Sequence, residues 1–236
     1  MLEYKIMEKI QLYIVPFAGG CSYSFKHMIP LLEDLFEVHA WDGPGKGVNS
    51  DQIRNSHFMD EARDFADYVT KHSQNRIYCT WGYSCGGLIC YEAMRLIQAD
   101  GTPMPKRVFL SAVRPAAEFI TPDTKPMTDE ELLSFLNDMS VGDNSISLLK
   151  NIDDIRRDME LASDYRYVDS GKVDTPASIM YADDDFVTET GVKNWENYFT
   201  EEVSFAAFHG RHFFYRHQPE ELAKYICKSV SGGQSL

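Results

Sequence analysis

The residues best suited to catalysis form the pentapeptide Gly82-Tyr83-Ser84-Cys85-Gly86. This segment follows a β-type run, RIYCTW, and leads directly into an apolar stretch of helical length. A sharp strand-to-helix turn has no room for side chains two residues either side of the serine, and it presents the serine hydroxyl as a nucleophile. The same spacing occurs by chance in purely structural turns. The position between a strand and a helix favours the catalytic interpretation.

A serine hydroxyl is a weak nucleophile until a base accepts its proton, and His212 is the strongest candidate for that base. It lies in the segment FHGRHFFY, where Gly210 permits a turn that aims the imidazole back at the serine. His209 and His217 are nearby alternatives, but the first ends the preceding strand and the second begins the last helix. The alternative role for His212 is that of a loop histidine with only a structural hydrogen bond.

A carboxylate is needed to hold the histidine in its reactive tautomer. Asp183, Asp184 and Asp185 directly follow the predicted strand ASIMY. We expect one of the three to accept the ring N–H of His212. Three adjacent acids are also typical of a solvated turn or of a hard-cation site. The neighbouring residues supply no further cation ligands, so we predict no metal site.

An oxyanion hole would take one backbone amide from Cys85, the residue after the nucleophile, and another from a loop after an early strand. The segment PFAGG, residues 16–20, is that loop, so we predict that Phe17 and Ala18 provide the second amide. A glycine-rich loop after a first strand can instead hold phosphate. Neither a Gly-x-Gly-x-x-Gly run nor a Gly-Lys-Ser/Thr ending follows it, so we predict no nucleotide or other cofactor.

The surrounding pattern alternates short β-type runs with longer amphipathic stretches, which predicts a mostly parallel sheet of about seven strands with helices on both faces. Helices are expected at Met59–His72 and at Gly86–Ala99, the second with a glycine C-cap at Gly101. The expected strands are Gln11–Val15, Glu37–Trp41, Arg76–Trp81, Arg107–Val113, Ala177–Tyr181 and Val203–Phe208, with a weaker edge strand at Leu2–Met7.

A segment of roughly 60 residues separates the strands that end at Val113 and begin at Ala177, which is more than a simple crossover requires. It contains MTDEELLSFLNDM, which opens with a helix start signal, and ISLLKNIDDIRRDMELASDY. We therefore expect one domain, residues 1–236, with an inserted helical lid at about 114–170 over the carboxyl ends of the strands.

The composition excludes several classes of function. The formal net charge of −13 argues against nucleic-acid binding, which needs a positive field. No segment is long and apolar enough for a membrane helix, and the N-terminus has no export signal. The five cysteines lack metal or redox spacing, and most are expected to be small buried hydrophobes. We therefore expect a cytoplasmic protein without membrane contact.

Nearly end to end, the chain resembles the type II thioesterases that accompany nonribosomal peptide and polyketide synthases. The resemblance is carried by PFAGG, by PGKG in the next loop, by GYSCGG where the family has Gly-His-Ser-Met-Gly-Gly, and by GRHFF where it has Gly-Gly-His-Phe-Phe. It implies an α/β-hydrolase fold with a Ser-His-Asp triad. It also favours Asp185 as the acid, with Asp184 in reserve, because Pro176 and Trp195 bracket Asp185 as in similar sequences. Arg211, where glycine is common, is expected to crowd the histidine loop or to offer a cation to a phosphate.

The resemblance further implies hydrolysis of acyl or aminoacyl thioesters on the phosphopantetheine arms of carrier proteins, as an editing activity, by a monomer. Because such carriers are themselves acidic, docking would rely on local cations such as Lys26, Arg114 or Arg211. One alternative is a carboxylesterase or lipase on the same fold, against which PFAGG and the lid segments argue. The other is an inactive hydrolase that only binds ligands, although no triad member is missing.

Overall fold

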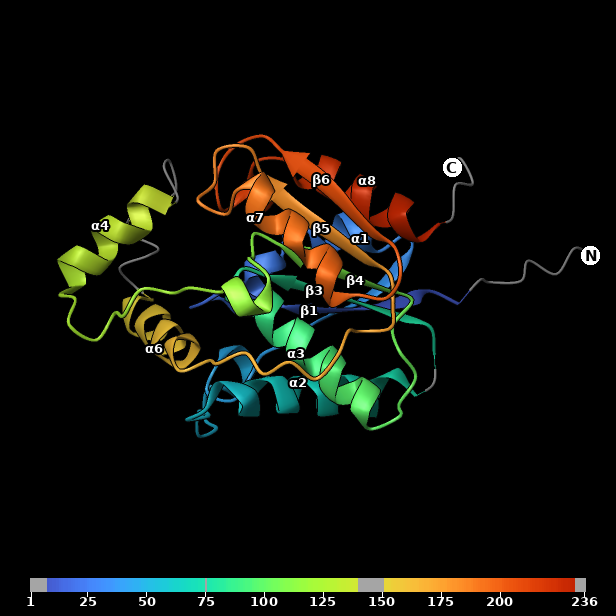
Figure 1. Cartoon of the computed structure of the whole chain (residues 1–236), viewed down its shortest axis with the longest axis horizontal. Coiled ribbons are helices and arrows are strands. Elements are labelled where there is room, and N and C mark those ends of the chain that lie inside the picture. The colour runs from blue at the N-terminus through green and yellow to red at the C-terminus, as the bar shows by residue number, and fades with distance from the viewer. Residues whose placement is uncertain (1–7, 75, 140–150, 232–236) are drawn as a thin grey trace, which may run out of the picture.

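A six-stranded sheet forms the centre of the computed structural model, which describes residues 8–74, 76–139 and 151–231. The strand order is β2-β1-β3-β4-β5-β6, and every pairing is parallel (Figure 1). The strands are β1 (Ile10–Val15), β2 (Phe36–Ala40), β3 (Tyr78–Tyr83), β4 (Arg107–Ser111), β5 (Ala177–Ala182) and β6 (Val203–Phe208). All six correspond to predicted strands, whereas the weaker edge strand at 2–7 lies outside the described residues.

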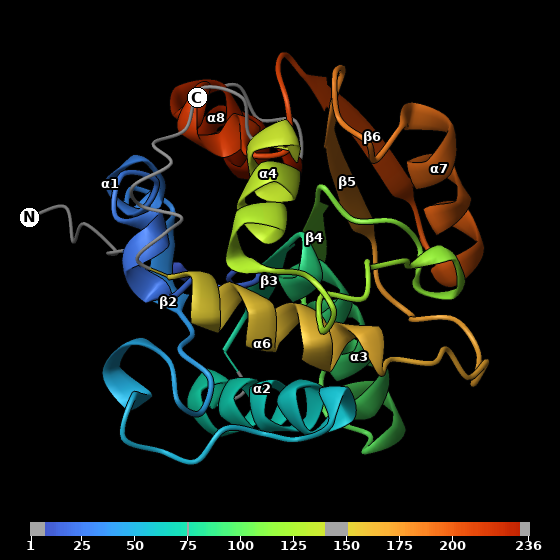
Figure 2. The ribbon, with the colours of Figure 1, turned by 90° about the vertical axis from the view of Figure 1, so that its left-hand side faces the viewer.

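Helices cover both faces of the sheet, as the alternating sequence pattern predicts (Figures 1 and 2). Helices α2 and α3 pack together on one face, and α1 and α8 pack together on the other. The helices are α1 (Ile29–Leu32), α2 (Phe58–Ser73), α3 (Cys85–Ala99), α4 (Asp129–Met139), α6 (Ile152–Ser163), α7 (Glu189–Lys193) and α8 (Pro219–Val230). Short 3₁₀ helices lie at Ser22–Phe25 (η1), Gly47–Asn49 (η2), Ala116–Glu118 (η3), Asn194–Tyr198 (η4) and Phe214–Arg216 (η5).

The apolar periodicity of the sequence explains how these helices attach. The predicted apolar face of α2 is buried beside α3: Phe58, Ala62, Phe65, Ala66 and Val69. Helix α3 is apolar on most sides and is buried as expected. It ends at Ala99, with Asp100 as its C-cap, and Gly101 follows in the left-handed region with φ of +69°. Among the described residues, the helices are all too short or too polar to cross a lipid bilayer.

The segment between β4 and β5 carries the predicted inserted helices α4 and α6. Thr128 and Glu131 cap the start of α4 reciprocally: the Glu131 N–H donates to the Thr128 hydroxyl, and the Thr128 N–H donates to the Glu131 carboxylate. Leu132 and Leu136 of α4 belong to a small apolar cluster with Ile155 of α6. Residues 146–150 of the second predicted helix lie outside the described residues. Both helices lie at one end of the sheet, in front of it in Figure 2.

Candidate active site

The turn between β3 and α3 has the geometry that its glycines predict. Ser84 has φ of +53°, an unusual value for a residue with a side chain, and its N–H donates to the Ser111 carbonyl at 2.8 Å. A Cβ atom on Gly82 would lie 2.4 Å from the Gly86 carbonyl oxygen, and one on Gly86 would lie 2.2 Å from the Pro16 carbonyl oxygen. Only glycine fits at both places, so the backbone can turn sharply and expose the serine.

Three side chains from separate loops meet at this turn. The Ser84 Oγ lies 2.8 Å from the His212 Nε2, and the His212 Nδ1 lies 2.9 Å from the Asp185 Oδ2. Ser84 follows β3, Asp185 follows β5 and His212 follows β6, so the carboxyl ends of the parallel strands bring them together. The structure thus joins the predicted nucleophile, base and acid in one hydrogen-bonded chain. Such a chain can pass a proton from the serine to the imidazole while the carboxylate holds the ring.

The rival histidines and aspartates have other partners. The exposed His209 lies 3.0 Å from Asp183, and this pair raises the pKa of His209 and lowers that of Asp183, which also accepts the Gly210 N–H. The Arg211 guanidinium lies 3.0 Å from the Asp184 carboxylate. Each acid of the Asp-Asp-Asp run therefore has its own partner, and Asp185 is the one bonded to His212. His217 is exposed at the end of η5.

Aromatic rings enclose His212, which is only 1% exposed. Phe186 stacks on the imidazole at a centroid distance of 4.9 Å, and Phe213 meets it edge-on at 5.2 Å. The hydroxyl of Tyr83, which is fully buried, donates to the His212 carbonyl oxygen at 2.5 Å. Burial raises the pKa of Tyr83, so the phenol keeps the proton that it donates. Tyr83, the departure from the family's usual histidine, thus fixes the backbone of the histidine loop.

The predicted oxyanion residues Phe17, Ala18 and Cys85 line the same pocket as Ser84 and His212. Cys85 is the first residue of α3, and the first N–H groups of a helix have no partner within it. The loop after β1 forms a tight turn in which the Gly20 N–H donates to the Phe17 carbonyl at 2.8 Å. Burial raises the pKa of the Cys85 thiol to about 12, so this thiol is no rival nucleophile at neutral pH.

A buried carboxylate that the sequence did not single out holds the loop after β1. The Gly19 N–H donates to the Asp158 Oδ2 at 2.7 Å, and Asp158 is 5% exposed on α6. Lys46 lies 3.0 Å from the other carboxylate oxygen, and Arg54 lies 3.4 Å from it. Burial alone would lower the pKa of Lys46, but the carboxylates of Asp158 and Glu61 outweigh this effect and raise it. The Asp158 carboxylate therefore ties α6 to the loop with the predicted oxyanion amides by a hydrogen bond, and to Lys46 and Arg54 before α2 by ion pairs.

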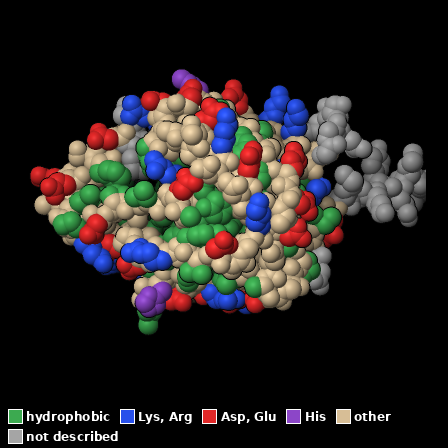
Figure 3. All heavy atoms as spheres, in the orientation of Figure 1, with side chains coloured by type: hydrophobic (Ala, Val, Ile, Leu, Met, Phe, Trp, Pro, Cys, Tyr) green, Lys and Arg blue, Asp and Glu red, His purple; other side chains and the backbone are tan. Residues whose placement is uncertain are grey.

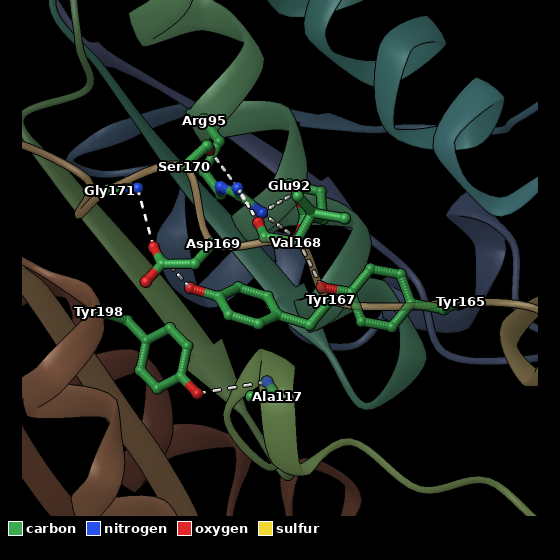
Figure 4. A network of polar contacts seen from close by, with 10 residues as sticks. All are labelled: Glu92, Arg95, Ala117, Tyr165, Tyr167, Val168, Asp169, Ser170, Gly171 and Tyr198. Carbon is green, nitrogen blue, oxygen red and sulfur yellow. Dashed lines mark hydrogen bonds and ion pairs between the residues drawn. The ribbon is translucent and has the colours of Figure 1, made fainter.

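The 114–170 segment is also attached near both of its ends (Figure 4). At its start, the Ala117 N–H donates to the Tyr198 hydroxyl at 3.2 Å. At its other end, the Tyr165 hydroxyl donates to the buried Glu92 of α3 at 2.5 Å. Arg95 of α3 donates to Glu92 at 2.8 Å and also to the Val168 carbonyl and the Ser170 hydroxyl. Neither of these attachments involves α4.

The pocket above Ser84 is narrow and mainly apolar, with a volume of about 90 Å³. Phe135 and Leu136 of α4, together with Ile155 and Met159 of α6, form its wall opposite the serine. Pockets for small-molecule ligands usually measure about 300–1,000 Å³. Within the part of the chain that the structure describes, the Asp138 carbonyl of α4 accepts a hydrogen bond from Arg211, whereas α6 is held by both Asp158 and Asp154.

The structure corrects two expectations from the sequence, one about Arg211 and one about the cysteines. Arg211 is 40% exposed and does not crowd the histidine loop, because its guanidinium turns to Asp184 and to the Asp138 carbonyl of α4. Of the five cysteines, only Cys79 and Cys90 are buried as whole residues, and the others are half-buried, although the Cys85 thiol itself is enclosed. Among residues 8–74, 76–139 and 151–231, no cluster of His, Cys, Asp or Glu is arranged to hold a metal ion.

The parallel sheet, the strained serine turn and the buried histidine that reaches both the serine and an aspartate define an α/β-hydrolase with a serine-type site. A family model for the thioesterase domain matches residues 10–230, so the chain belongs to the thioesterase domain family. This membership confirms the predicted class of enzyme. Among curated proteins, no significant match was found.

Solved structures confirm the fold. RedJ, a thioesterase from the prodiginine biosynthetic pathway in Streptomyces coelicolor, is 23% identical with a TM-score of 0.85, over 92% of this chain and 84% of that one. ClbQ from the colibactin NRPS/PKS pathway is 21% identical with a TM-score of 0.85, over 94% and 97%. YbtT, a type II thioesterase from the yersiniabactin NRPS/PKS pathway, is 20% identical with a TM-score of 0.83, over 98% and 96%.

Proposed function

We propose that this thioesterase hydrolyses acyl or aminoacyl groups bound as thioesters to the phosphopantetheine arms of carrier proteins, as an editing enzyme of a nonribosomal peptide or polyketide assembly line. One observation carries the proposal: Ser84, His212 and Asp185 are linked by hydrogen bonds of 2.8 and 2.9 Å at the base of an apolar pocket. Membership of the thioesterase domain family indicates that the bond that the enzyme cleaves is a thioester. The structures of similar fold named above come from biosynthetic pathways that include NRPS/PKS systems, which supports a carrier-bound substrate.

In the first half of the reaction, the Ser84 hydroxyl attacks the thioester carbonyl carbon while His212 Nε2 takes the hydroxyl proton. Asp185 stabilises the imidazolium through its bond to Nδ1. The amides of Cys85 and of Phe17 or Ala18 stabilise the negative oxygen of the tetrahedral intermediate. The intermediate collapses with cleavage of the carbon–sulfur bond, and the imidazolium protonates the leaving thiolate. The products are an acyl-serine ester and the free thiol of the pantetheine arm.

In the second half, water attacks the acyl-serine carbonyl as His212 takes one of its protons, and the same amides stabilise the new oxyanion. Collapse releases the carboxylic acid, and the imidazolium returns a proton to the Ser84 oxygen. The aromatic and apolar walls exclude bulk water from the imidazole, which strengthens each charge interaction in the site. The enzyme thus returns a carrier with a free thiol, which is the outcome that editing requires.

The proposal includes how the chain is organised. The whole chain acts as one domain and as a monomer in the cytoplasm, and residues 114–170 act as a lid that admits the acyl group. The match of a single family model to residues 10–230 supports the single domain. The narrow pocket beneath α4 and α6 supports the lid. Sedimentation at micromolar concentration tests the monomer, since a dimer would give twice the 27.0 kDa mass.

A panel of acyl-loaded carrier proteins tests the proposed substrate class. The purified protein should release free carrier thiol from acyl carriers and should act poorly on p-nitrophenyl esters of the same acyl groups. A strong preference for the oxygen esters would instead identify a carboxylesterase on this fold. A fluorophosphonate probe provides the control for an intact site, because it should label Ser84 covalently and only an active serine reacts with it.

A further inference from the structure

Arg211 bridges the histidine loop and the inserted helix α4. Its Nε atom donates to the Asp184 carboxylate at 3.0 Å, and its Nη1 atom donates to the Asp138 carbonyl at 3.0 Å. Asp184 directly precedes the triad acid, and Asp138 lies in the last turn of α4. Arg211 itself directly precedes His212, whose Nε2 lies 2.8 Å from the Ser84 Oγ. One guanidinium therefore connects the two triad loops with α4.

The two triad loops form a fixed base for this bridge. The Asp183 N–H donates to the Phe208 carbonyl at 3.0 Å. The Asp184 N–H donates to the Gly210 carbonyl, also at 3.0 Å, and the Asp183 carboxylate accepts the Gly210 N–H at 2.9 Å. These hydrogen bonds hold the acid loop against the histidine loop next to Arg211. The loops therefore set the position of the guanidinium, and α4 is the part that Arg211 holds in place.

The end of α4 lacks a cation of its own. The last carbonyls of a helix have no N–H partner within it, and the negative end of the helix dipole lies there. The last turn, residues 136–139, contains no Lys or Arg in its sequence and carries the carboxylate of Asp138. Figure 3 shows acidic side chains on the end of the molecule where Figure 1 places α4. Arg211 supplies the cation, and its loss would leave the negative helix end facing the Asp184 carboxylate.

The start of α4 is attached differently from its end. Arg156 of α6 donates to the Met127 carbonyl at 2.8 Å and lies 2.8 Å from the Asp129 carboxylate. These contacts hold the first turn of α4 to the other inserted helix, whereas Arg211 holds the last turn to the histidine loop. Loss of the Arg211 contact would therefore let the end of α4 move while its start stays on α6.

Phe135, about one turn before Asp138 on α4, lies at the boundary of two cavities. It lines the pocket of Ser84, of about 90 Å³, and also a second cavity of about 550 Å³. Phe186, whose ring stacks on His212, lines both cavities as well. The second cavity is completed by Asp138, Asp184, Asp185 and Arg211. The position of α4 therefore decides whether the Ser84 pocket is closed at Phe135 or continues past it.

We propose that Arg211 determines the length of the acyl chain that the enzyme accepts, by holding Phe135 between the Ser84 pocket and the second cavity. The inference rests on the proposed function, since it assumes acyl thioester hydrolysis at Ser84, but it requires no carrier protein. With Arg211 in place, a short acyl group fits the pocket of about 90 Å³. When the end of α4 moves away, a longer chain can extend past Phe135.

The size of the effect follows from the two contacts of Arg211. An exposed ion pair and a cation at a helix C-terminus each change an equilibrium about two- to fivefold. Loss of both contacts should therefore raise the ratio of open to closed α4 by about 4- to 25-fold. The apparent affinity for a ligand that needs the open form rises with the fraction of protein in that form. The same factor should thus appear in kcat/KM for a long acyl group.

Two thioesters that differ only in chain length test the proposal: acetyl-N-acetylcysteamine and decanoyl-N-acetylcysteamine. The measured quantity is the ratio of kcat/KM for the decanoyl substrate to that for the acetyl substrate, which should lie below one in the intact protein. Arg211→Gln should raise this ratio about 4- to 25-fold. Arg211→Lys keeps the charge and should raise it less. The matched control is Arg63→Gln, which removes an exposed 3.0 Å ion pair with Asp100 outside the inserted segment and should leave the ratio unchanged.

A double-variant cycle tests whether Arg211 acts through Phe135. Phe135→Ala removes the ring at the boundary and should raise the ratio by itself. Adding Arg211→Gln to Phe135→Ala should then change the ratio little, because the path is already open. Amide exchange in residues 129–138 should also be faster in Arg211→Gln than in Arg63→Gln, which tests the contact with α4 independently of activity.

An unchanged ratio in Arg211→Gln would overturn the assignment while leaving thioester hydrolysis intact. Effects of Arg211→Gln and Phe135→Ala that simply multiply would overturn the route through Phe135. An equal fall of kcat for both substrates in Arg211→Gln would also overturn the assignment, because Arg211 would then position the triad and not α4. Failure of the intact protein to hydrolyse either thioester would instead overturn the proposed function.

Discussion

Replacing Asp158 with alanine should destabilise the protein more than any change on the exposed side of α6. The carboxylate is 5% exposed and has three partners: the Gly19 N–H at 2.7 Å, Lys46 at 3.0 Å and Arg54 at 3.4 Å. Its removal leaves the Lys46 ammonium, whose side chain is 15% exposed, without its nearest anion. It also leaves the Gly19 N–H without an acceptor.

The size of the effect follows from these contacts. Removing one partner of a buried ion pair costs about 3–5 kcal/mol, and a buried N–H without an acceptor costs about 1–3 kcal/mol. Arg54 keeps its 2.6 Å pair with Asp154, Lys46 retains some access to water and Gly19 is only half-buried, so we expect a total loss in the lower part of the ion-pair range. A loss of about 3–4 kcal/mol is a large part of a typical stability of about 5–15 kcal/mol.

Urea unfolding of Asp158→Ala measures this loss, with Asp153→Ala as the matched control. Asp153 is exposed in the first turn of the same helix, and its removal should cost less than about 1 kcal/mol. Asp158→Asn separates charge from hydrogen bonding, because its amide oxygen can still accept the Gly19 N–H. At a temperature where all variants are folded, kcat should fall by up to about 100-fold in Asp158→Ala and less in Asp158→Asn. Equal stability of the Asp158→Ala and Asp153→Ala variants would refute the argument that α6 is clamped by this carboxylate.

Three further outcomes are expected. Asp185→Asn should lower kcat by about 10⁴-fold, far more than the same change at Asp183 or Asp184. If Asp184→Asn lowers kcat the most, the assignment of Asp185 as the triad acid is refuted. Amide exchange should be faster in α4 than in the sheet and should slow when a non-hydrolysable acyl-pantetheine binds; protection equal to that of the sheet without ligand would contradict a lid. Hydrolysis of acyl carriers should have a higher kcat/KM than hydrolysis of the same acyl groups on coenzyme A or N-acetylcysteamine, and this kcat/KM should fall little as salt rises from low to moderate levels. Equal values of kcat/KM, or a steep fall with salt, would contradict short-range docking on an acidic enzyme.

Much of the fold and of the triad could be predicted because the signals are local. The glycines around Ser84 indicate a sharp turn that only glycine allows at those positions, and the structure shows which backbone atoms a Cβ on either glycine would meet. The apolar period of α2 and the start signal of α4 likewise depend on residues within one or two turns. Each candidate catalytic residue directly follows a predicted strand, and this order along the chain was enough to place the carboxyl ends of β3, β5 and β6 together.

The missed features are those that join residues distant in the chain. Gly19 and Asp158 are 139 positions apart, and in the sequence Asp158 is one acid among several on a helix with a polar face. The contact between Tyr83 and the His212 carbonyl spans 129 positions. The partner of Arg211 was also missed, because its side chain could turn toward the active site or away from it, and only the packing of α4 against the histidine loop decides.

The most direct test of the central claim is the hydrolysis of one acyl carrier thioester by the intact protein and by Ser84→Ala. The Ser84 Oγ, 2.8 Å from the His212 Nε2, is the only atom that the variant removes, so the fold should persist, as circular dichroism can verify. We predict that kcat falls by about four to six orders of magnitude. A folded Ser84→Ala variant that retains more than about a tenth of the original rate would contradict the proposed nucleophile and with it the mechanism.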